Sequence, residues 1–581
     1  MRARQRGGLA YTAVRMTVGR ERFGMRAGAW RVALAGVVAL AGCSEKRAPV
    51  AALEGPCRHT SLGQVCHTLG GAPAQDDDEP VLELECDLPP EGQALRDEVW
   101  DPTPQAEQPE TCEEAVASKS YVGCEFWPTV TANGVAYIFD FAVVVANTGA
   151  EPADVVVERD GEQFAHVTVA PNSLEKIFLP WVDALKVGLI ECDENRVAPA
   201  KSVRVAHGAY HLTSDRPVVA YQFNPFEFET SGGPPDKDWK ECTRASYSND
   251  ASLLLPVQAL GTSYRGMTFS SVDDWLESPP TLTVTGTADD TTVTVYAPAN
   301  YSVSAGVGVP PIPKGSKYDF TLNAGDVLQL SSSDLSLAGA LIESDRPVQV
   351  ISGHYCADVP SGVYTCDHLE ETLPPAQALG RRYLVAPPTG PDGLPIPYAV
   401  TFQGNQDGTQ LFYPGGKPKG APDTLQAGES SFIANVDEKF EVLATRELGL
   451  LLFLQGGSAI DNLSTDPSQS ISVPLQQYRR RYVFLAANDY VVNYADVIAP
   501  SGAVIEVDGK VVTAEREPFS CSSYEVVRVW LDQSGDGIHV LEASEPVSVQ
   551  VLGHAFATSY QYPGGLNFSE ISEAPPRPVV K

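Results

Sequence analysis

The 581-residue chain has only four methionines, few positive charges and, beyond residue 43, no apolar run long enough to span a bilayer. Lysine and arginine total 41 against 74 aspartates and glutamates, so the formal net charge is −33. This excess of negative charge argues against a nucleic-acid partner, whose phosphates would be repelled. Apolar patterns with a 3.6-residue period are nearly absent, which argues against a helical protein.

Short motifs of common enzymes are absent too. The chain has no G-x-S-x-G elbow, no H-E-x-x-H pair and no G-x-x-x-x-G-K-[ST] loop. Carboxylates are plentiful, but none stands in a recognisable catalytic context. We therefore expect a protein that is not an enzyme and needs no cofactor. An extracellular glycan-processing hydrolase is the alternative.

The N-terminal segment has the pattern of an export signal. Several arginines precede the apolar run 32–40, which is too short to cross a membrane. Leu40-Ala41-Gly42-Cys43 then matches a bacterial lipobox, in which the cysteine thiol takes a lipid. We predict a signal peptide over 1–42 and a palmitate-carrying lipoprotein anchored at Cys43. Ser44 favours the outer membrane and cell surface by resemblance to lipoprotein sorting.

Ten more cysteines follow, an even number that suits disulfide formation in an oxidising compartment. Pairs that are close in the sequence are expected first, and each would stabilise the fold by roughly 2–4 kcal/mol. The predicted pairs are Cys57–Cys66, Cys112–Cys124, Cys192–Cys242 and Cys356–Cys366, which leaves Cys86 and Cys521 as a fifth.

From about Tyr121 the sequence repeats two markers. The first is SDRPV at Ser214 and Ser344, with weaker copies at Thr445 and Ser544. In each copy a polar turn leads into an apolar strand, and proline suits the strand entry because it costs no interior ladder bond. The second marker ends in tyrosine, as LLPVQALGTSY at Tyr264, TLPPAQALGRRY at Tyr383 and SVPLQQYRRRY at Tyr482.

The marker spacing predicts an all-β chain of four repeat units. Their bounds are 119–250, 251–371, 372–470 and 471–570, followed by a tail over 571–581. Short alternating strands and tight turns favour one β-sandwich-like module per unit. A closed β-propeller with two blades per unit is the alternative. Residues 43–118 have the proline and acidic residues of a disordered tether.

Two stretches of the second unit resemble a known family. Residues 348–360 read VQVISGHYCADVP, and residues 366–375 read CDHLEETLPP. With the preceding DRPV strand and the LPVQALG segment, they resemble the IgGFc-binding protein N-terminal domain over roughly residues 200–560. This resemblance implies a non-catalytic extracellular binding or adhesion module, whose ligand is an unknown extracellular protein or glycan.

Metal binding is weighed at two places. His354, Cys356, Cys366 and His368 could form a zinc site or a disulfide flanked by histidines, and an oxidising compartment favours the disulfide. Residues 532–537 resemble the start of a calcium loop, but Ala543 stands where an EF-hand needs glutamate. We expect a hairpin turn there, with calcium as the alternative. His207 and His211 are interpreted as structural strand residues.

One long loop is the ligand-binding candidate. Residues 221–242 include Phe226, Phe228 and Trp239, and long loops on rigid scaffolds often bind ligands. Exposed aromatic rings would suit sugars or protein surfaces. The alternative is that these rings cover the end of a sheet. A structural envelope protein whose repeats only assemble is the third functional class.

Overall fold

The computed structural model describes residues 58–60, 63–65, 86–98, 108–186, 201–227, 246, 248–270, 279–363, 366–460, 464–488, 490–532 and 537–580. The chain divides into two compact units, Met1–Val81 and Leu82–Lys581. In the smaller unit, β1 (Arg58–Thr60) pairs antiparallel with β2 (Gly63–Val65). The remaining described elements belong to the larger unit.

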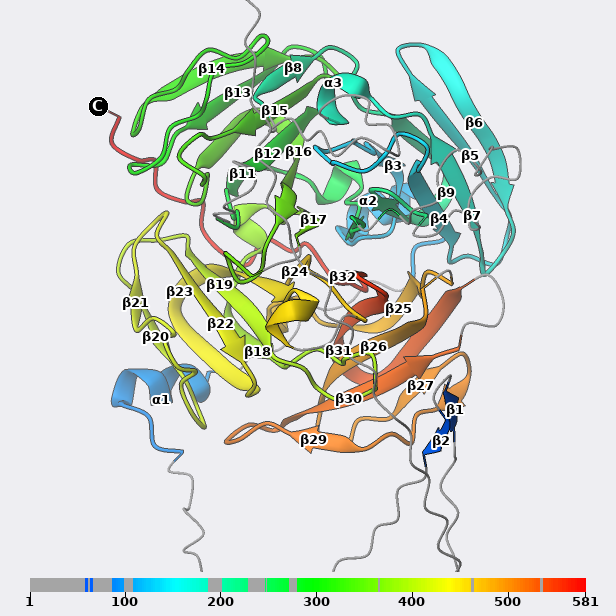
Figure 1. Ribbon diagram of the computed structural model, residues 1–581, viewed down its shortest axis with the longest axis vertical. Coiled ribbons are helices and arrows are strands. Elements are labelled where there is room, and N and C mark those ends of the chain that lie inside the picture. The colour runs from blue at the N-terminus through cyan, green and yellow to red at the C-terminus, as the bar shows by residue number, and fades with distance from the viewer. Residues whose placement is uncertain are drawn as a thin grey trace, which may run out of the picture. The chain divides into compact units, whose positions relative to one another are not determined.

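The larger unit is built from four antiparallel sheets of similar plan (Figure 1). The first sheet contains β3 (Gly123–Phe126), β4 (Phe141–Asn147), β5 (Ala153–Arg159), β6 (Glu162–Val169), β7 (Ser173–Leu179), β9 (His211–Phe223) and β10 (Ala251–Leu253). The second contains β8 (Val203–Val205), β11 (Gly261–Arg265), β12 (Pro280–Gly286), β13 (Thr291–Tyr296), β14 (Lys317–Leu322), β15 (Val327–Ser331), β16 (Leu341–Ala357) and β17 (Asp367–Thr372).

The other two sheets follow the same order along the chain. The third contains β18 (Gly380–Val385), β19 (Tyr398–Gly404), β20 (Thr409–Phe412), β21 (Thr424–Leu425), β22 (Ser430–Val436), β23 (Phe440–Leu454) and β24 (Ser468–Ile471). The fourth contains β25 (Arg479–Leu485), β26 (Val492–Pro500), β27 (Ile505–Val507), β28 (Lys510–Val511), β29 (Arg516–Pro518), β30 (Tyr524–Leu531), β31 (Ile538–Ala555) and β32 (Thr558–Pro563). The all-β class with four similar sheets is therefore confirmed.

The first sequence marker is the place where each sheet curls. In β16, the residues before Asp345 pair with β11 and β13, whereas the residues after Val348 pair with β12 and β17, and Val348 itself pairs with both β11 and β12. The Asp345–Pro347 segment between them makes no ladder pair in these registers, so a proline without an N–H fits there. β9, β23 and β31 change partners in the same way. One long strand thus serves both halves of a sandwich-like sheet.

The second marker contacts the first through its tyrosine. The hydroxyls of Tyr264, Tyr383 and Tyr482 donate to the carbonyls of Val348, Leu448 and Val547 at 2.6, 2.6 and 2.5 Å. Each hydroxyl also accepts the backbone N–H three residues before it. The repeated tyrosine therefore ties the first strand of a unit to the bend of its long strand.

Consecutive units meet at the glycine that stands three residues before the marker tyrosine, because this glycine contacts a proline of the next unit. A Cβ added to Gly261 would lie 2.6 Å from Pro375 Cβ, and one added to Gly380 would lie 2.3 Å from Pro474 Cβ. The fourth unit has Arg479 at this position, and its guanidinium contacts Asn567 in the C-terminal segment. The C-terminal segment also bonds to the start of the first unit, where the Phe568 N–H donates to the Lys119 carbonyl oxygen at 2.8 Å.

The innermost strands of the four sheets lie side by side at the centre of the larger unit. β10 contacts β17 and β32, and β24 contacts the same two strands, so the four strands close a ring. Figure 1 shows β17, β24 and β32 near the centre of the larger unit. One apolar core runs through all four sheets; for example, the rings of Tyr221 and Tyr562 lie 4.8 Å apart, and those of Phe269 and Phe453 lie 5.2 Å apart. The units are therefore packed together and share their core.

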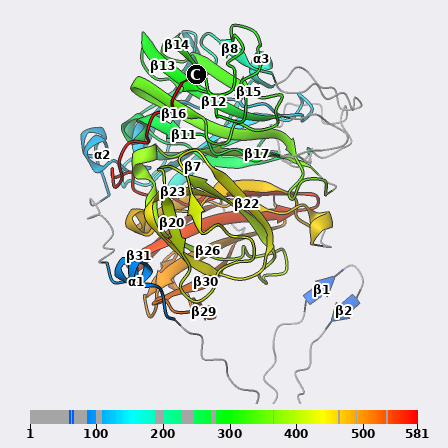
Figure 2. The ribbon, with the colours of Figure 1, turned by 90° about the vertical axis from the view of Figure 1, so that its left-hand side faces the viewer.

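Part of the segment predicted as a disordered tether is ordered. α1 (Pro90–Arg96) and α2 (Cys112–Ser118) both form within residues 43–118, and Figure 2 shows them on the same side of the larger unit. A capping box begins α2: the Thr111 hydroxyl accepts the Glu114 backbone N–H, and the Glu114 carboxylate accepts the Thr111 backbone N–H. The disulfides Cys86–Cys521 and Cys112–Cys124 join these segments to the sheets. The tether prediction is wrong for these two helices, because capping and cross-links offset their low apolar content.

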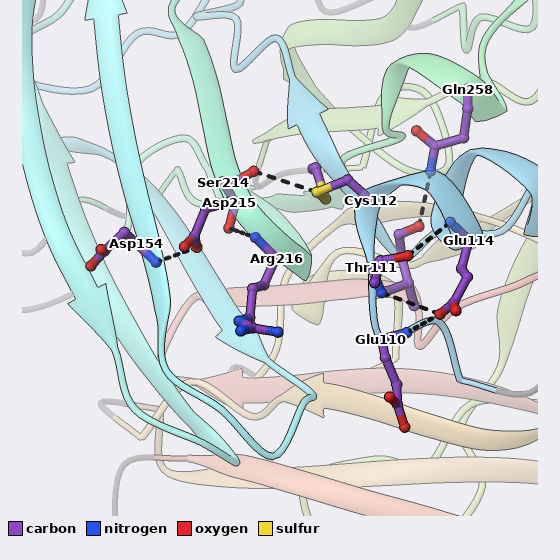
Figure 3. Close-up of a disulfide and its surroundings, with 11 residues drawn as sticks. Glu110, Thr111, Cys112, Glu114, Asp154, Ser214, Asp215, Arg216 and Gln258 are labelled. Carbon is purple, nitrogen blue, oxygen red and sulfur yellow. Dashed lines mark hydrogen bonds between the residues drawn. A yellow bond between two sulfur atoms is a disulfide. The ribbon is translucent and has the colours of Figure 1, made fainter.

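Figure 3 shows how closely α2 lies against the first sheet. Cys112 Sγ lies 3.6 Å from the carbonyl oxygen of Ser214, at the SDRPV bend of β9, and Asp215 accepts the backbone N–H of Asp154 at 2.8 Å. Gln258 donates to the Val122 carbonyl at 2.9 Å. The remaining short helices are α3 (Asp183–Lys186) and single 3-10 turns. Within the described ranges, every helix is too short or too polar to cross a bilayer.

Candidate functional site

The residues that carry the family resemblance lie at the centre of the ring. β17 holds Asp367, His368, Glu370 and Glu371, and each of these side chains is at most 1% exposed. Asp250, just before β10, is equally buried. We call these five residues the central cluster. It is sealed from solvent, so a ligand would have to open the ring to reach it.

Hydrogen bonds from the central cluster join different units. One carboxylate oxygen of Asp250 accepts the backbone N–H groups of Glu370 and Gln469, both at 3.0 Å. Glu370 accepts from Thr131 at 3.0 Å and from Gln222 at 3.2 Å. These contacts span all of the first three sheets. The central cluster therefore has a structural role in closing the ring.

Burial raises the pKa of three carboxyl groups in the central cluster. Desolvation raises the pKa of Asp250 well above its ordinary value, against three backbone N–H bonds that act the other way. Burial also raises the pKa of Asp367, helped by the nearby charges of Asp466 and Asp250. The pKa of Glu371 is raised by burial and then by Asp250. The neighbouring His368 Nε2 lies 3.6 Å from Glu370.

Three of the predicted cysteine pairs are present as disulfides: Cys86–Cys521, Cys112–Cys124 and Cys356–Cys366. The last one uses both sulfurs that the zinc alternative needed, so this motif is a clipped turn beside β17. Cys57, Cys66, Cys192 and Cys242 lie outside the described residues, as does Cys43. Residues 533–536 of the calcium alternative lie outside them too.

The predicted aromatic ligand contact at Phe226 is wrong. Its side chain is 0% exposed and packs edge-on against Phe223 and Phe178, at 5.0 and 5.9 Å between ring centroids. Lys176 Nζ lies 4.6 Å from the centre of the same ring. The ring belongs to the core of the first sheet, where burying its apolar area stabilises the fold more than exposure would. Phe228 and Trp239 lie outside the described residues.

An accessible cleft of about 420 Å³ opens at the rim, where the first and second sheets meet. It lies between the β5–β6 hairpin tip, the turn before β9, the first residue of β9 and the turn between β14 and β15. Its polar lining consists of Trp127, Glu158, Arg159, Asp160, His207 and His211, and glycines and alanines complete it. We call this the rim cleft.

A stacked pair of rings forms one wall of the rim cleft. Trp127 and His211 lie 4.2 Å apart at an interplanar angle of 14°. Trp127 is 6% exposed and the His211 side chain is 33% exposed, so the imidazole is the solvent-facing ring. His211 Nε2 lies 3.0 Å from Glu125 Oε1. Trp127 Nε1 is buried and has no hydrogen-bond partner among the described residues.

The opposite wall is formed by two turns. Asp160, at the hairpin tip, and His207 both have positive φ, at 52° and 50°, and their side chains face each other across 3.8 Å. The backbone N–H of His207 donates to the buried Asp326 at 3.1 Å, which holds the turn in place. Gly325 approaches so closely that a Cβ there would lie 3.3 Å from the Trp127 ring, and its φ is +79°.

Arg159 is oriented by aromatic rings. Its guanidinium carbon lies 4.7 Å from the ring centre of Tyr210 and 5.1 Å from that of Phe164. Its Nη1 donates to the Tyr210 hydroxyl at 3.0 Å, and that hydroxyl donates to the Pro180 carbonyl at 2.6 Å. Burial raises the pKa of Tyr210 to about 12, so it remains a neutral donor.

Sequence reasoning noticed His207 and His211 but missed the rim cleft. His211 lies opposite Glu158 within the first sheet, whereas His207 and Gly325 reach the cleft from β8 and the β14–β15 turn of the second sheet. No local spacing encodes that meeting. The one available signal was Trp127, an aromatic residue directly after a strand, in the segment GCEFWPT.

Comparison with known proteins places the chain in a family. The model of the family described as IgGFc binding protein matches residues 250–553, just over half of the chain. A Homo sapiens protein named IgGFc-binding protein is 29% identical over 322 residues, which cover 54% of this chain and 6% of the human protein. The matched range contains the central cluster, whereas most of the rim cleft precedes it. The chain belongs to the IgGFc-binding protein family.

Proposed function

We propose that this protein is a lipid-anchored cell-surface protein that binds an extracellular protein or glycan and does not transform it. The observation that supports this most directly is the family match over residues 250–553, because the family is named for binding. The human relative is named for binding the Fc part of IgG, and only its name supports extending a binding role to this chain.

The proposed location at the cell surface is supported by different residues. Leu40-Ala41-Gly42-Cys43 follows an apolar run of signal-peptide length, and Cys43 would carry the lipid. The disulfides Cys112–Cys124 and Cys356–Cys366 agree with an oxidising compartment. Several acyl chains, at roughly 0.8 kcal/mol per buried CH₂, would hold the protein durably at the outer membrane.

Binding is tested by presenting the full chain to an array of glycans and extracellular proteins that includes immunoglobulin Fc. We expect saturable binding to at least one class, with the bound ligand recovered unchanged. Turnover of any glycan on the array, or saturable binding to none of the probes, would contradict the proposal.

Anchoring is tested separately by metabolic labelling with palmitate. We expect label in the native chain and none in Cys43→Ala, which should also leave the membrane fraction. Ser44→Ala is the matched control, and it should keep the label. Equal labelling of native and Cys43→Ala protein would refute the anchor and leave the binding proposal standing.

A further inference from the structure

We propose that the rim cleft binds a single neutral saccharide unit of a glycan. This inference rests on the proposed binding function and narrows its ligand from protein or glycan to glycan. It concerns the first sheet, most of which lies before the matched range of the family. The proposal is argued from the volume of the cleft, from the charged and aromatic residues that line it, and from its stacked rings.

The lining lacks the residue types of a lipid site. Among the described residues around the cleft, the larger side chains are charged, imidazole or indole groups, and the others are alanine and glycine. Branched aliphatic side chains, which usually dominate sites for lipids and apolar peptide anchors, do not contribute to it. A volume of about 420 Å³ falls within the range of small-molecule sites.

Apart from Glu158, the ionisable side chains of the lining each contact a partner within the protein. Asp160 faces His207 at 3.8 Å, and Glu125 contacts His211 at 3.0 Å. Arg159 lies against the Tyr210 and Phe164 rings. A strongly charged ligand would have to displace these partners, whereas a neutral ligand can bind while they remain in place.

Hydroxyl groups fit such paired side chains. A hydroxyl donates one hydrogen bond and accepts others, so it can bridge a carboxylate and an imidazole or guanidinium N–H. Within the lining, Asp160 with His207 offers an acceptor beside a donor. The apolar face of a pyranose ring can then lie on the exposed His211 imidazole, which Trp127 supports from behind at 4.2 Å.

Backbone hydrogen bonds hold the walls of the cleft in place. The His207 turn is fixed by its N–H bond to Asp326, and Ala209 N–H donates to the Gly325 carbonyl at 3.0 Å. Preformed walls reduce the ordering cost that a ligand must offset. The same interactions keep the two sheets together at the rim, so the cleft exists before a ligand arrives.

The test uses two substitutions that suit the backbone. Asp160→Asn and His207→Asn each remove an ionisable group at a positive-φ position, where asparagine is well tolerated. Asp290→Asn is the matched control, because Asp290 is an exposed aspartate at φ +53° in a turn of the second sheet, outside the cleft. The full chain is titrated with methyl glycosides of glucose, galactose, mannose and N-acetylglucosamine, followed by saturation-transfer NMR.

We expect at least one methyl glycoside to bind native protein and Asp290→Asn equally. Asp160→Asn and His207→Asn should each weaken that binding by about tenfold or more, as expected for a lost hydrogen bond to a charged group. Unchanged affinity in both variants, or no binding of any of the four glycosides, would overturn the assignment of the cleft. If the array still shows a saturable ligand in that case, the proposed function survives and only this site fails.

Discussion

Two groups of carboxylates and imidazoles in this protein differ mainly in their access to water. In the central cluster, Asp250, His368 and Glu370 are fully buried, and their side chains form hydrogen bonds with groups of neighbouring units. In the rim cleft, the side chains of Asp160 and His207 are 73% and 51% exposed and face an open space. The same residue types therefore join sheets at the centre and remain available to a ligand at the rim.

This difference separates the family signature from the place of recognition. The residues Asp367–Glu371 of the family motif are sealed inside the ring, so this part of the motif serves ring closure. Surface turns differ between the four sheets, and function more often resides in such turns than in the core. Four changes test this contrast, ordered from the largest expected effect to the smallest.

The largest effect is expected from Asp250→Ala. The change leaves the buried N–H groups of Glu370 and Gln469 without their acceptor and should cost about 3–5 kcal/mol of unfolding free energy. Urea unfolding followed by tryptophan fluorescence measures it. Asp250→Asn keeps a carbonyl oxygen there and should lose less. An unchanged midpoint for Asp250→Ala would show that the central cluster does not hold the ring together.

The second test is pH. The pKa values of Asp250, Asp367 and Glu371 are raised, so the folded state binds protons more tightly than the unfolded chain does. Their stabilising contribution is complete below the unfolded values near about 4 and is lost as pH rises through the folded values. We expect the urea midpoint to fall between pH 5 and pH 8.

A pair of glutamate-to-glutamine variants tests whether that pH dependence arises in the central cluster. Glu371→Gln removes one titrating group but keeps an oxygen for the Thr372 N–H, so it should flatten the decline. Glu573→Gln, at an exposed position in the C-terminal segment, should leave the decline as it is. A midpoint that rises with pH would contradict the raised pKa values.

An intermediate effect is expected from Tyr383→Phe. The hydroxyl of Tyr383 is buried and neutral, and it links Gly380 N–H to the Leu448 carbonyl. Its removal should cost about 1–2 kcal/mol in the same urea experiment. In the first unit, Phe126 follows Gly123 by three residues, as Tyr383 follows Gly380 in the third unit. Gly123 still pairs with Val218 there, so the sheet tolerates phenylalanine in place of tyrosine at this position. Tyr318→Phe, at a 44% exposed tyrosine, should cost almost nothing.

The smallest effect on stability is expected at the rim. Asp160→Asn and His207→Asn should each change the unfolding free energy by less than about 0.5 kcal/mol, as is usual for exposed positions. Differential scanning calorimetry beside Asp290→Asn checks this. A loss as large as that of Asp250→Ala would mean that the rim is also structural, and the contrast between the two clusters would disappear.

Much of the architecture could be predicted because it depends on sequence patterns between residues that are close in the chain. Alternating strands, SDRPV and the tyrosine marker indicated four β units, and cysteine spacing indicated Cys112–Cys124 and Cys356–Cys366. The prediction that Phe226 contacts a ligand was wrong because composition alone does not say whether this side chain points into the core or outward. α1 and α2 were missed because their order depends on cross-links to distant strands.

By itself, the sequence determined the strands, the repeat period, the markers and the family resemblance, since each depends on residues close together in the chain. Only the tertiary structure decided that Asp250, Glu370 and Gln469 meet at a sealed centre, and that Trp127, Asp160 and His207 surround an open cleft. The physical reason is that burial and desolvation depend on how four sheets close around one another. Side chains with the same chemistry are therefore given different roles by their distance from water.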